Sequence, residues 1–310
     1  YPGTPATEVL EYVSGYPEVH AEWSINEKVA MEIATGASLS RVRAMAVMKH
    51  NGTNVILDFL MHVNFTGVRG GLVLISADDP GAFSSQNEED SRIITHIDAH
   101  LPVFDPCCPQ EAKDMVKAAF ELSEKTELCF VVRPVMRVCH ARSPVTIEEI
   151  TPVVREPLFE DDRFRFVMSA VQEPEYGGVL RPVLRHKWLN QKQPMLLQIM
   201  EDSPFNHVEE GEGKIGLIAF GIGYAYVKEA EKILGKKFPV LKLGTLPLPK
   251  SKVLEFARKM NKLVVYEDTE PVVERLIKEL MFNEKIQIEV LGRSGFLPME
   301  GELSATVVLK

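Results

Sequence analysis

The sequence predicts an α/β protein with two open, mainly parallel sheets that belong to two domains. Short β-branched runs alternate with stretches of helical periodicity over residues 1–135, and the alternation returns over residues 214–310. This pattern is typical of parallel strands with helices between them. At 310 residues the chain also exceeds the usual size of one domain. Residues 136–213, which carry many prolines and charges, are expected to connect the two domains.

In the first region, five short strands and three helices are expected. The strands are placed at residues 19–23, 43–48, 71–76, 103–105 and 127–133, and the helices at 25–38, 53–65 and 109–123. The last helix has the clearest pattern, because its apolar residues recur at the spacing of one helix face. These residues are Met115, Ala118, Ala119 and Leu122.

The connecting segment and the second region follow in the same way. The connection is expected to be ordered, with one helix around residues 179–190, because it keeps several aromatic residues. The second region is predicted to have strands at 214–220, 239–244, 262–266 and 286–291, and helices at 223–234, 249–260 and 269–281. The glycine-containing tail after residue 291 is expected to be a loop.

Composition excludes several classes of function. No apolar run approaches the roughly 20 residues of a membrane helix, and no basic leader of the secretory kind is present. A formal net charge of −9 disfavours nucleic-acid binding, because phosphate contacts need a cationic face. These features favour an acidic cytoplasmic enzyme. The chain begins with Tyr1 rather than Met, which suggests either an excised segment or a chain whose true beginning lies upstream.

The cysteines and histidines do not predict a metal centre in this chain. Cys107, Cys108, Cys129 and Cys139 lack the spacing of zinc or iron–sulfur ligands and are interpreted as reduced, buried residues. The histidines are dispersed, without the pairing of a metal-binding helix. Any iron–sulfur cluster is therefore expected in a partner or in a segment outside this sequence.

Glu27 follows Asn26 at the point where a predicted strand gives way to a helix. A carboxylate is favoured there by the partial positive charge of the helix N-terminus. Apolar neighbours would favour its neutral form, so that it could exchange a proton near neutral pH. Thiamine diphosphate needs such a carboxyl group, which hydrogen-bonds a ring nitrogen of its aminopyrimidine. An isolated Asn-Glu pair can also be purely structural. The apolar neighbours are Val19, Trp23, Val29, Ile33 and Ala34.

Three further segments have both a functional and a structural interpretation. Residues 49–54 form a predicted strand-to-helix loop, in which Gly52 lets the backbone approach a flat ligand and Thr53 or Asn54 caps the next helix. Residues 78–90 form a long polar loop after a parallel strand, where open α/β sheets place ligands. Gly221-Ile-Gly223 is interpreted as a tight turn, because the third glycine of a dinucleotide fingerprint is absent.

Five segments in fixed order resemble a single enzyme family. They are Tyr1-Pro-Gly-Thr-Pro, Glu22-Trp-Ser-Ile-Asn-Glu27-Lys-Val-Ala, Met48-Lys-His-Asn-Gly-Thr-Asn54, Thr66-Gly-Val-Arg-Gly-Gly71 and Ala77-Asp-Asp-Pro-Gly-Ala-Phe-Ser-Ser-Gln86. Together they resemble the α subunits of indolepyruvate:ferredoxin oxidoreductases, within the 2-oxoacid:ferredoxin oxidoreductases. The resemblance covers residues 1–135 and continues more loosely, through residues 203–206, into a region similar to the transketolase C-terminal domain.

The resemblance implies a role for several residues. Residues 1–135 would form the pyrimidine-binding domain for thiamine diphosphate, with Glu27 as the activating carboxylate and the segment with Lys49, Gly52 and Asn54 beside the aminopyrimidine. The substrate side would consist of Thr4, Ser84, Ser85 and Gln86. Lys49, Arg69 and Arg92 remain alternatives for binding the substrate carboxylate. The implied reaction is oxidative decarboxylation of an aryl pyruvate to an acyl-CoA, with electrons delivered to ferredoxin.

The sequence departs from the family in lacking half of the cofactor site. No Gly-Asp dipeptide occurs, so the Mg²⁺ and diphosphate ligands are expected on a partner domain or chain. The resemblance also implies an oligomer that binds coenzyme A and a 2-oxoacid. A non-catalytic relative that acts as an assembly or docking module is the alternative. A carboligase of the acetolactate synthase kind fits the motifs less well.

Overall fold

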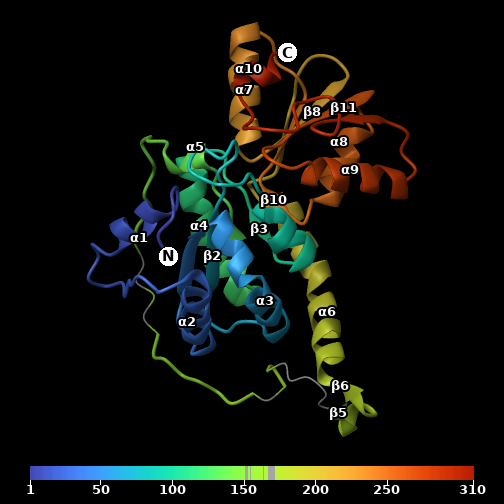
Figure 1. Ribbon diagram of the computed structural model, residues 1–310. Helices are drawn as coiled ribbons and strands as arrows, with labels where there is room; N and C mark the ends of the chain where they lie inside the picture. Colours follow the sequence, from blue (N-terminus) through green and yellow to red (C-terminus); the bar gives the residue numbers. More distant parts are fainter. Residues whose placement is uncertain (151–152, 154, 163, 167–171) are drawn as a thin grey trace.

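The computed structural model describes residues 1–150, 153, 155–162, 164–166 and 172–310. It contains two five-stranded sheets, one in the first part of the chain and one in the last part (Figure 1). In each sheet, four of the strands pair in parallel and one edge strand is antiparallel. The predicted α/β class with two mainly parallel sheets is confirmed. The antiparallel edge strands were not predicted.

The first sheet has the strand order β1-β2-β4-β3-β10. Its parallel strands are β1 (Ala44–Lys49), β2 (Leu72–Ala77), β4 (Phe130–Val132) and β3 (Val103–Phe104). The helices of this region are α1 (Thr7–Val13), α2 (Glu27–Leu39), α3 (His50–Thr66), the π-helical η1 (Ile93–Asp98), α4 (Pro109–Thr126) and α5 (Met136–Cys139). The predicted helices at 25–38, 53–65 and 109–123 correspond to α2, α3 and α4.

One predicted strand of the first region is wrong. Residues 19–23 form turns and irregular chain, and the side chains of Val19 and Trp23 are 49% and 47% exposed. A β-branched run becomes a strand only where a neighbouring strand can pair with it and a core can cover it. The edge strand β1 pairs with β2 alone, so residues 19–23 join no ladder of the sheet.

The connecting segment contains a helix that is longer than predicted. Helix α6 spans Arg181–Asp202 and continues through Pro194, because Leu189, Leu196 and Met200 are buried against the rest of the protein. A small hairpin of β5 (Gln172–Glu173) and β6 (Val179–Leu180), with the 3₁₀ turn η2 (Pro174–Tyr176), lies at its outer end (Figure 1). The predicted helix at 179–190 is therefore only the first part of α6.

The second sheet has the order β12-β11-β8-β9-β7. Its strands are β7 (His207–Glu209), β8 (Ile215–Phe220), β9 (Val240–Leu243), β11 (Lys262–Tyr266) and β12 (Glu289–Leu291), and its helices are α7 (Ile222–Leu234), α8 (Lys250–Ala257) and α9 (Val272–Asn283). The tail is not only a loop, because α10 (Ala305–Val308) forms beside α7 (Figure 1). Val307 and Val308 of α10 pack against the apolar cluster that covers this sheet.

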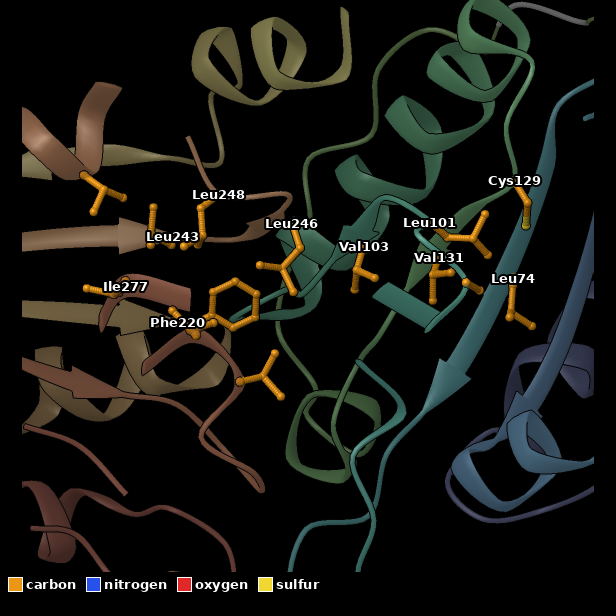
Figure 2. Packing of buried hydrophobic residues seen from close by; sticks show 14 of the residues in the cluster. Leu74, Leu101, Val103, Cys129, Val131, Phe220, Leu243, Leu246, Leu248 and Ile277 are labelled. Atoms are coloured by element: carbon orange, nitrogen blue, oxygen red, sulfur yellow. The ribbon is translucent and has the colours of Figure 1, made fainter. Parts of the chain in front are cut away.

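The two sheets share one apolar core. Strand β10 (Thr245–Leu246) follows the second-sheet strand β9 in sequence but pairs antiparallel with β3 of the first sheet. Figure 2 shows Leu246 between Val103 of the first sheet and Phe220 of the second. This continuity could not be predicted from local patterns. The domain limits at residues 135 and 213 stay a prediction. Among the described residues, no helix is both long enough and apolar enough to cross a bilayer.

Two buried arginines also join the halves of the molecule. Arg92 binds Asp90 and reaches Glu267 at 2.8 Å, and Arg133 lies 2.6 Å from both Asp78 and Asp105. All six of these side chains are at most 1% exposed. Arg133 also donates to the hydroxyl of Thr269, in the second region, at 3.1 Å. Burial raises the pKa of Asp90, but the two guanidinium groups outweigh it and lower this pKa to about 2. Asp90 is therefore charged, whereas burial raises the pKa of Asp105 and that of Glu267.

The Gly221-Ile-Gly223 turn packs against this cluster. A Cβ at Gly221, whose φ is +51°, would lie 2.0 Å from Oδ1 of Asp105, and a Cβ at Gly223 would lie 2.3 Å from the carbonyl oxygen of Tyr266. Both glycines are therefore required for close packing between protein segments. The interpretation as a tight turn agrees with this geometry, and no space for a phosphate remains at these two positions.

Candidate functional site

Glu27 is the first residue of α2, as the sequence predicted for a helix start. The side chain of Asn26 caps this helix by accepting a hydrogen bond from the backbone N–H of Val29 at 2.9 Å. The Glu27 side chain packs against Gly52 in the first turn of α3. A Cβ at Gly52 would lie 2.5 Å from Cγ and 2.9 Å from Oε1 of Glu27, closer than such atoms come in proteins. Only glycine lets this carboxylate lie against α3.

The apolar shell predicted around Glu27 is not assembled by the described residues. Val19, Trp23 and Ile33 are 49%, 47% and 48% exposed. Ile33 is six residues from Glu27 on α2 and therefore lies on a different side of the helix, while residues 19–23 form no strand that could fold over it. Among the described residues, no group donates a hydrogen bond to the Glu27 carboxylate, which is partly exposed.

Residues 49–54 do not form the predicted loop. Strand β1 runs directly into α3, so that Lys49 is the last strand residue and also the N-cap position of the helix, without a side-chain cap. Thr53 lies inside the helix and its hydroxyl is 2.7 Å from the hydroxyl of Ser76. Asn54 is exposed and donates to Glu89 at 2.7 Å. The prediction that Thr53 or Asn54 caps the helix is wrong, because the helix begins three residues earlier.

Lys49 holds the serine-containing loop of residues 78–90 against the carboxyl end of β1. Its ammonium group donates to Oδ2 of Asp79 at 3.1 Å, to the carbonyl oxygen of Ser84 at 3.0 Å and to the Ser84 hydroxyl oxygen at 2.9 Å. The Ser84 hydroxyl also contacts the carbonyl oxygen of Thr4 at 3.3 Å. The structure thus brings together Thr4, Lys49 and Ser84 at one edge of the first sheet.

Asp79 is the centre of this arrangement, and the sequence analysis did not single it out. Its buried carboxylate accepts hydrogen bonds from the hydroxyl of Ser85 at 2.7 Å, from the backbone N–H of Ser84 at 2.9 Å and from that of Phe83 at 3.2 Å. Burial raises the pKa of Asp79, but these bonds and Lys49 outweigh it and lower the pKa. An aspartate followed by two serines within one loop was the available sequence signal.

His50 is a second residue that the sequence analysis missed. It opens α3, is 1% exposed, and its Nδ1 accepts a hydrogen bond from the backbone N–H of Asp79 at 3.2 Å. Its Nε2 is buried without a partner among the described residues. The ring therefore fixes the start of the serine loop relative to α3. A histidine between a strand and a glycine was the only local signal, and it carries no information about a loop 29 residues away.

Other predicted site residues are not all brought together. Gln86 is exposed at the surface of the loop. Arg92 belongs to the buried ion cluster, which excludes it as a free substrate-binding cation. Arg69 pairs with Glu160 at 2.8 Å and precedes β2. It therefore lies at the amino ends of the parallel strands, whereas Lys49 lies at their carboxyl ends. Of the three cations proposed from sequence, only Lys49 is at the candidate site.

The described residues fit the aminopyrimidine end of thiamine diphosphate but not its diphosphate end. Glu27 offers a partly exposed carboxylate beside a glycine, which suits a flat ring that needs a hydrogen bond to one nitrogen. Among the same residues, no group of three or more His, Cys, Asp or Glu side chains has the arrangement of a metal site. Lys49, at the carboxyl end of β1, already pairs with Asp79.

Comparison with known proteins identifies relatives that match nearly the whole chain. No family model matches the sequence. The chain is 40% identical over 305 residues to the indolepyruvate oxidoreductase subunit IorA of Pyrococcus abyssi, covering 94% of this chain and 45% of the relative. Identity to the IorA subunit of Archaeoglobus fulgidus is 39%, with 97% of this chain and 48% of the relative covered. Identity to the IorA subunit of Methanothermobacter thermautotrophicus is 37%, with 100% of this chain and 50% of the relative covered.

Two solved structures share the fold at low sequence identity. A 2-oxoglutarate:ferredoxin oxidoreductase from Magnetococcus marinus, determined with 2-oxoglutarate, coenzyme A and succinyl-CoA, matches with a TM-score of 0.70 and 18% identity over 100% of this chain and 60% of that one. A split-gene transketolase, described as an inactive β4 tetramer, matches with a TM-score of 0.59 and 16% identity over 94% of this chain and 79% of that one. The fold is therefore that of transketolase and the 2-oxoacid:ferredoxin oxidoreductases. By sequence, the chain is a homologue of the IorA subunits of indolepyruvate oxidoreductase and spans about half of their length.

Proposed function

We propose that this chain provides the aminopyrimidine half of a thiamine diphosphate site in an aryl 2-oxoacid:ferredoxin oxidoreductase. The complete enzyme would convert an aryl pyruvate such as indolepyruvate, with coenzyme A, to carbon dioxide and an acyl-CoA, and would pass the electrons to ferredoxin through iron–sulfur clusters held elsewhere. The observation that carries the proposal is the Glu27 carboxylate packed on Gly52 at the first turns of α2 and α3.

Glu27 would act by holding a proton at one atom of the cofactor. Its carboxyl group would hydrogen-bond a ring nitrogen of the aminopyrimidine, and the absence of a side chain at Gly52 would let the ring approach. When bound, thiamine diphosphate supplies the electron sink that decarboxylation of a 2-oxoacid requires.

The substrate side would be formed by the cluster at the ends of β1 and β2. Ser84 and Ser85 carry hydroxyl groups there, Thr4 places its carbonyl oxygen beside Ser84, and Gln86 is the next residue of the same loop. In this arrangement Lys49 acts as a positioning residue, because its three N–H donors are directed to Asp79 and Ser84. A rigid loop would let the hydroxyl groups orient the 2-oxoacid without moving on binding.

The other half of the site would come from a partner domain or chain. Apolar side chains near the candidate site are strongly exposed, which favours a surface that a second protein segment covers. Among them, Trp23 and Ile25 precede Glu27, and Val55 follows Gly52 on α3, with exposures of 47%, 82% and 51%. Such a segment would supply the Mg²⁺ and diphosphate ligands, and the assembled protein would be an oligomer.

The alternative function is a non-catalytic relative that serves in assembly or docking. The observation that favours it is the lack of a metal-binding group among the described residues, together with the missing Gly-Asp dipeptide. The two proposals differ in one measurable property. Calorimetry of thiamine diphosphate with Mg²⁺ would detect binding to the assembled complex for the enzyme component, and none under any condition for the docking module.

The test of catalysis is Glu27→Gln in the complete complex. This substitution keeps the size of the side chain but removes the exchangeable carboxyl proton, and we expect 2-oxoacid-dependent ferredoxin reduction to fall by about 100-fold or more. The matched control is Glu32→Gln on the exposed side of the same helix. Unchanged turnover in the Glu27 variant, with a complex that is intact by size-exclusion chromatography, would reject the proposed role.

A further inference from the structure

A cavity of about 340 Å³ lies beside the serine loop and is lined by Phe83, Met136, Arg137, His140 and Ala141. Its walls are an aromatic ring, a thioether, an imidazole and a methyl group, with one charged side chain. Phe83 is 61% exposed, so most of its ring is available to a ligand. The volume is at the lower end of the range for small-molecule sites. It suits a single ring system better than a whole nucleotide cofactor.

The backbone connects the walls of the cavity to the candidate substrate side. Phe83 immediately precedes Ser84, and the backbone N–H groups of both residues donate to the carboxylate of Asp79, at 3.2 and 2.9 Å. The opposite wall begins at Met136, whose backbone N–H donates to the carbonyl oxygen of Asp78 at 2.8 Å. Both walls are therefore fixed to the same acidic pair at the end of β2.

The charge of the cavity is neutralised from the C-terminal tail. Arg137 Nε donates to a carboxylate oxygen of Glu302 at 2.7 Å, and its terminal nitrogen reaches the other oxygen of the same group. The guanidinium carbon lies 5.4 Å from the centre of the Phe83 ring. A cation paired in this way offers little attraction to a second carboxylate. The cavity therefore favours a neutral, flat ligand group over an anionic one.

We infer that this cavity binds the aromatic ring of the 2-oxoacid, with Phe83 as the specificity-determining residue. The inference rests on the proposed function and adds to it the place of the substrate side chain. The reacting carboxyl and keto groups would lie toward Ser84 and Thr4, and the ring would stack on the exposed face of Phe83. Glu302 is a positioning residue, because it holds Arg137, whose guanidinium carbon lies over that ring.

The experiment compares two substrates in the complete complex. For Phe83→Ala we expect kcat/KM for phenylpyruvate to fall about tenfold relative to kcat/KM for 2-oxobutyrate, the effect of losing one aromatic contact. The conservative variant Phe83→Tyr should keep most of the preference. The matched control is Phe282→Ala, which removes an 81% exposed phenylalanine of α9 that does not line the cavity.

Three outcomes separate this inference from the proposed function. A selective loss for phenylpyruvate in Phe83→Ala supports the ring site. If kcat/KM falls equally for both substrates, or does not fall, the ring site is overturned while the proposed enzyme function stands. If the wild-type complex reduces ferredoxin with neither 2-oxoacid, the proposed function fails and the ring site falls with it. Inhibition of the wild-type and variant complexes by phenylacetate, which does not react, gives an independent binding measurement that should weaken with Phe83→Ala alone.

Discussion

Two parallel strands of this protein, one in each sheet, end in a pair of acidic residues, and the two pairs have different roles. Strand β2 leads into Asp78 and Asp79, and β11 leads into Glu267 and Asp268. All four are buried. In each pair, the first acid binds an arginine of the first region: Asp78 binds Arg133, and Glu267 binds the arginine at position 92.

The second acids of the two pairs, Asp79 and Asp268, differ in the number of hydrogen-bond donors around their carboxylates. Asp79 receives donors from two serines and a lysine, which lower its pKa. Asp268 accepts one hydrogen bond, from the backbone N–H of Leu303 at 2.7 Å, and its Oδ2 has no partner among the described residues. Burial raises the pKa of Asp268 to about 6. Two aspartates at equivalent positions after a parallel strand thus have different roles. Asp79 organises an exposed loop, and Asp268 is packed where the two halves of the molecule meet.

The largest effect is expected when Arg133, the cation that binds the first acid after β2, is removed. Arg133→Met would leave Asp78, Asp105 and Asp90 buried with less compensation, and we expect the free energy of unfolding to fall by about 3–5 kcal/mol. The measurement is urea unfolding followed by circular dichroism. Arg137→Met, which breaks an exposed pair with Glu302, should cost less than about 1 kcal/mol. Equal costs would contradict the interface role of the cluster.

The next prediction concerns the pH dependence caused by Asp268. Its pKa is near 6 in the folded protein and 3.8 in the unfolded chain, so the folded state binds more protons between these values and stability falls as pH rises from 4 to 7. The wild type should lose about 2 kcal/mol over this window relative to Asp268→Asn, which does not titrate. Thermal unfolding at pH 4 and 7 measures the difference. If the difference in stability between the wild type and Asp268→Asn were the same at pH 4 and pH 7, Asp268 would not be desolvated in the folded protein.

A smaller and local effect is expected at the serine loop. Asp79→Asn keeps one acceptor oxygen but loses the charge that binds Lys49 and the serine hydroxyls, and we expect a cost of about 1.5 kcal/mol. Hydrogen exchange of the backbone amides of Phe83 and Ser84 should become faster, while exchange in the strands of the second sheet should not change. Faster exchange throughout the protein would instead indicate a global loss of stability.

The smallest effect compares two helical glycines. A Cβ at Gly36 of α2 meets nothing within 4 Å, so Gly36→Ala should stabilise the protein by about 0.5–1 kcal/mol. Gly52→Ala of α3 should give no such gain, because its methyl group would displace Glu27. The free energies of unfolding of both variants test this contrast. A similar gain at Gly52 would mean that Glu27 can move away without cost, which would weaken the proposed cofactor contact.

Much of the fold was predictable because its signals are local. Helical periodicity located α4 and α7 to within a few residues, and the continuous apolar runs located β8 and β11. The strand expected at 19–23 and the loop expected at 49–54 were wrong, because each depended on whether a neighbouring segment would pair with or cover the residues. Strand β10 was missed for the same reason, since two residues become a strand only beside β3.

The candidate site was predictable in part. Motifs in fixed order led to Glu27, Gly52 and the serine loop, and the structure places these residues at one edge of the first sheet. They did not lead to Asp79 or His50, whose importance comes from hydrogen bonds to other loops. Nor could they distinguish Lys49 from Arg92, because the sequence does not show that Lys49 lies at the serine loop and Arg92 in the buried ion cluster.

The sequence by itself determined the class of fold, the order of most elements and the homology to one group of oxidoreductase subunits, because periodicity and motif order are carried by neighbouring residues. Only the tertiary structure decided which acids face a loop and which face an interface, and which aromatic ring lines the cavity beside the serine loop. Those decisions depend on contacts between residues that are far apart in the chain, such as Arg92 and Glu267, which are separated by 175 positions. Burial and pairing at such contacts set the charge of each group, and local sequence does not encode them.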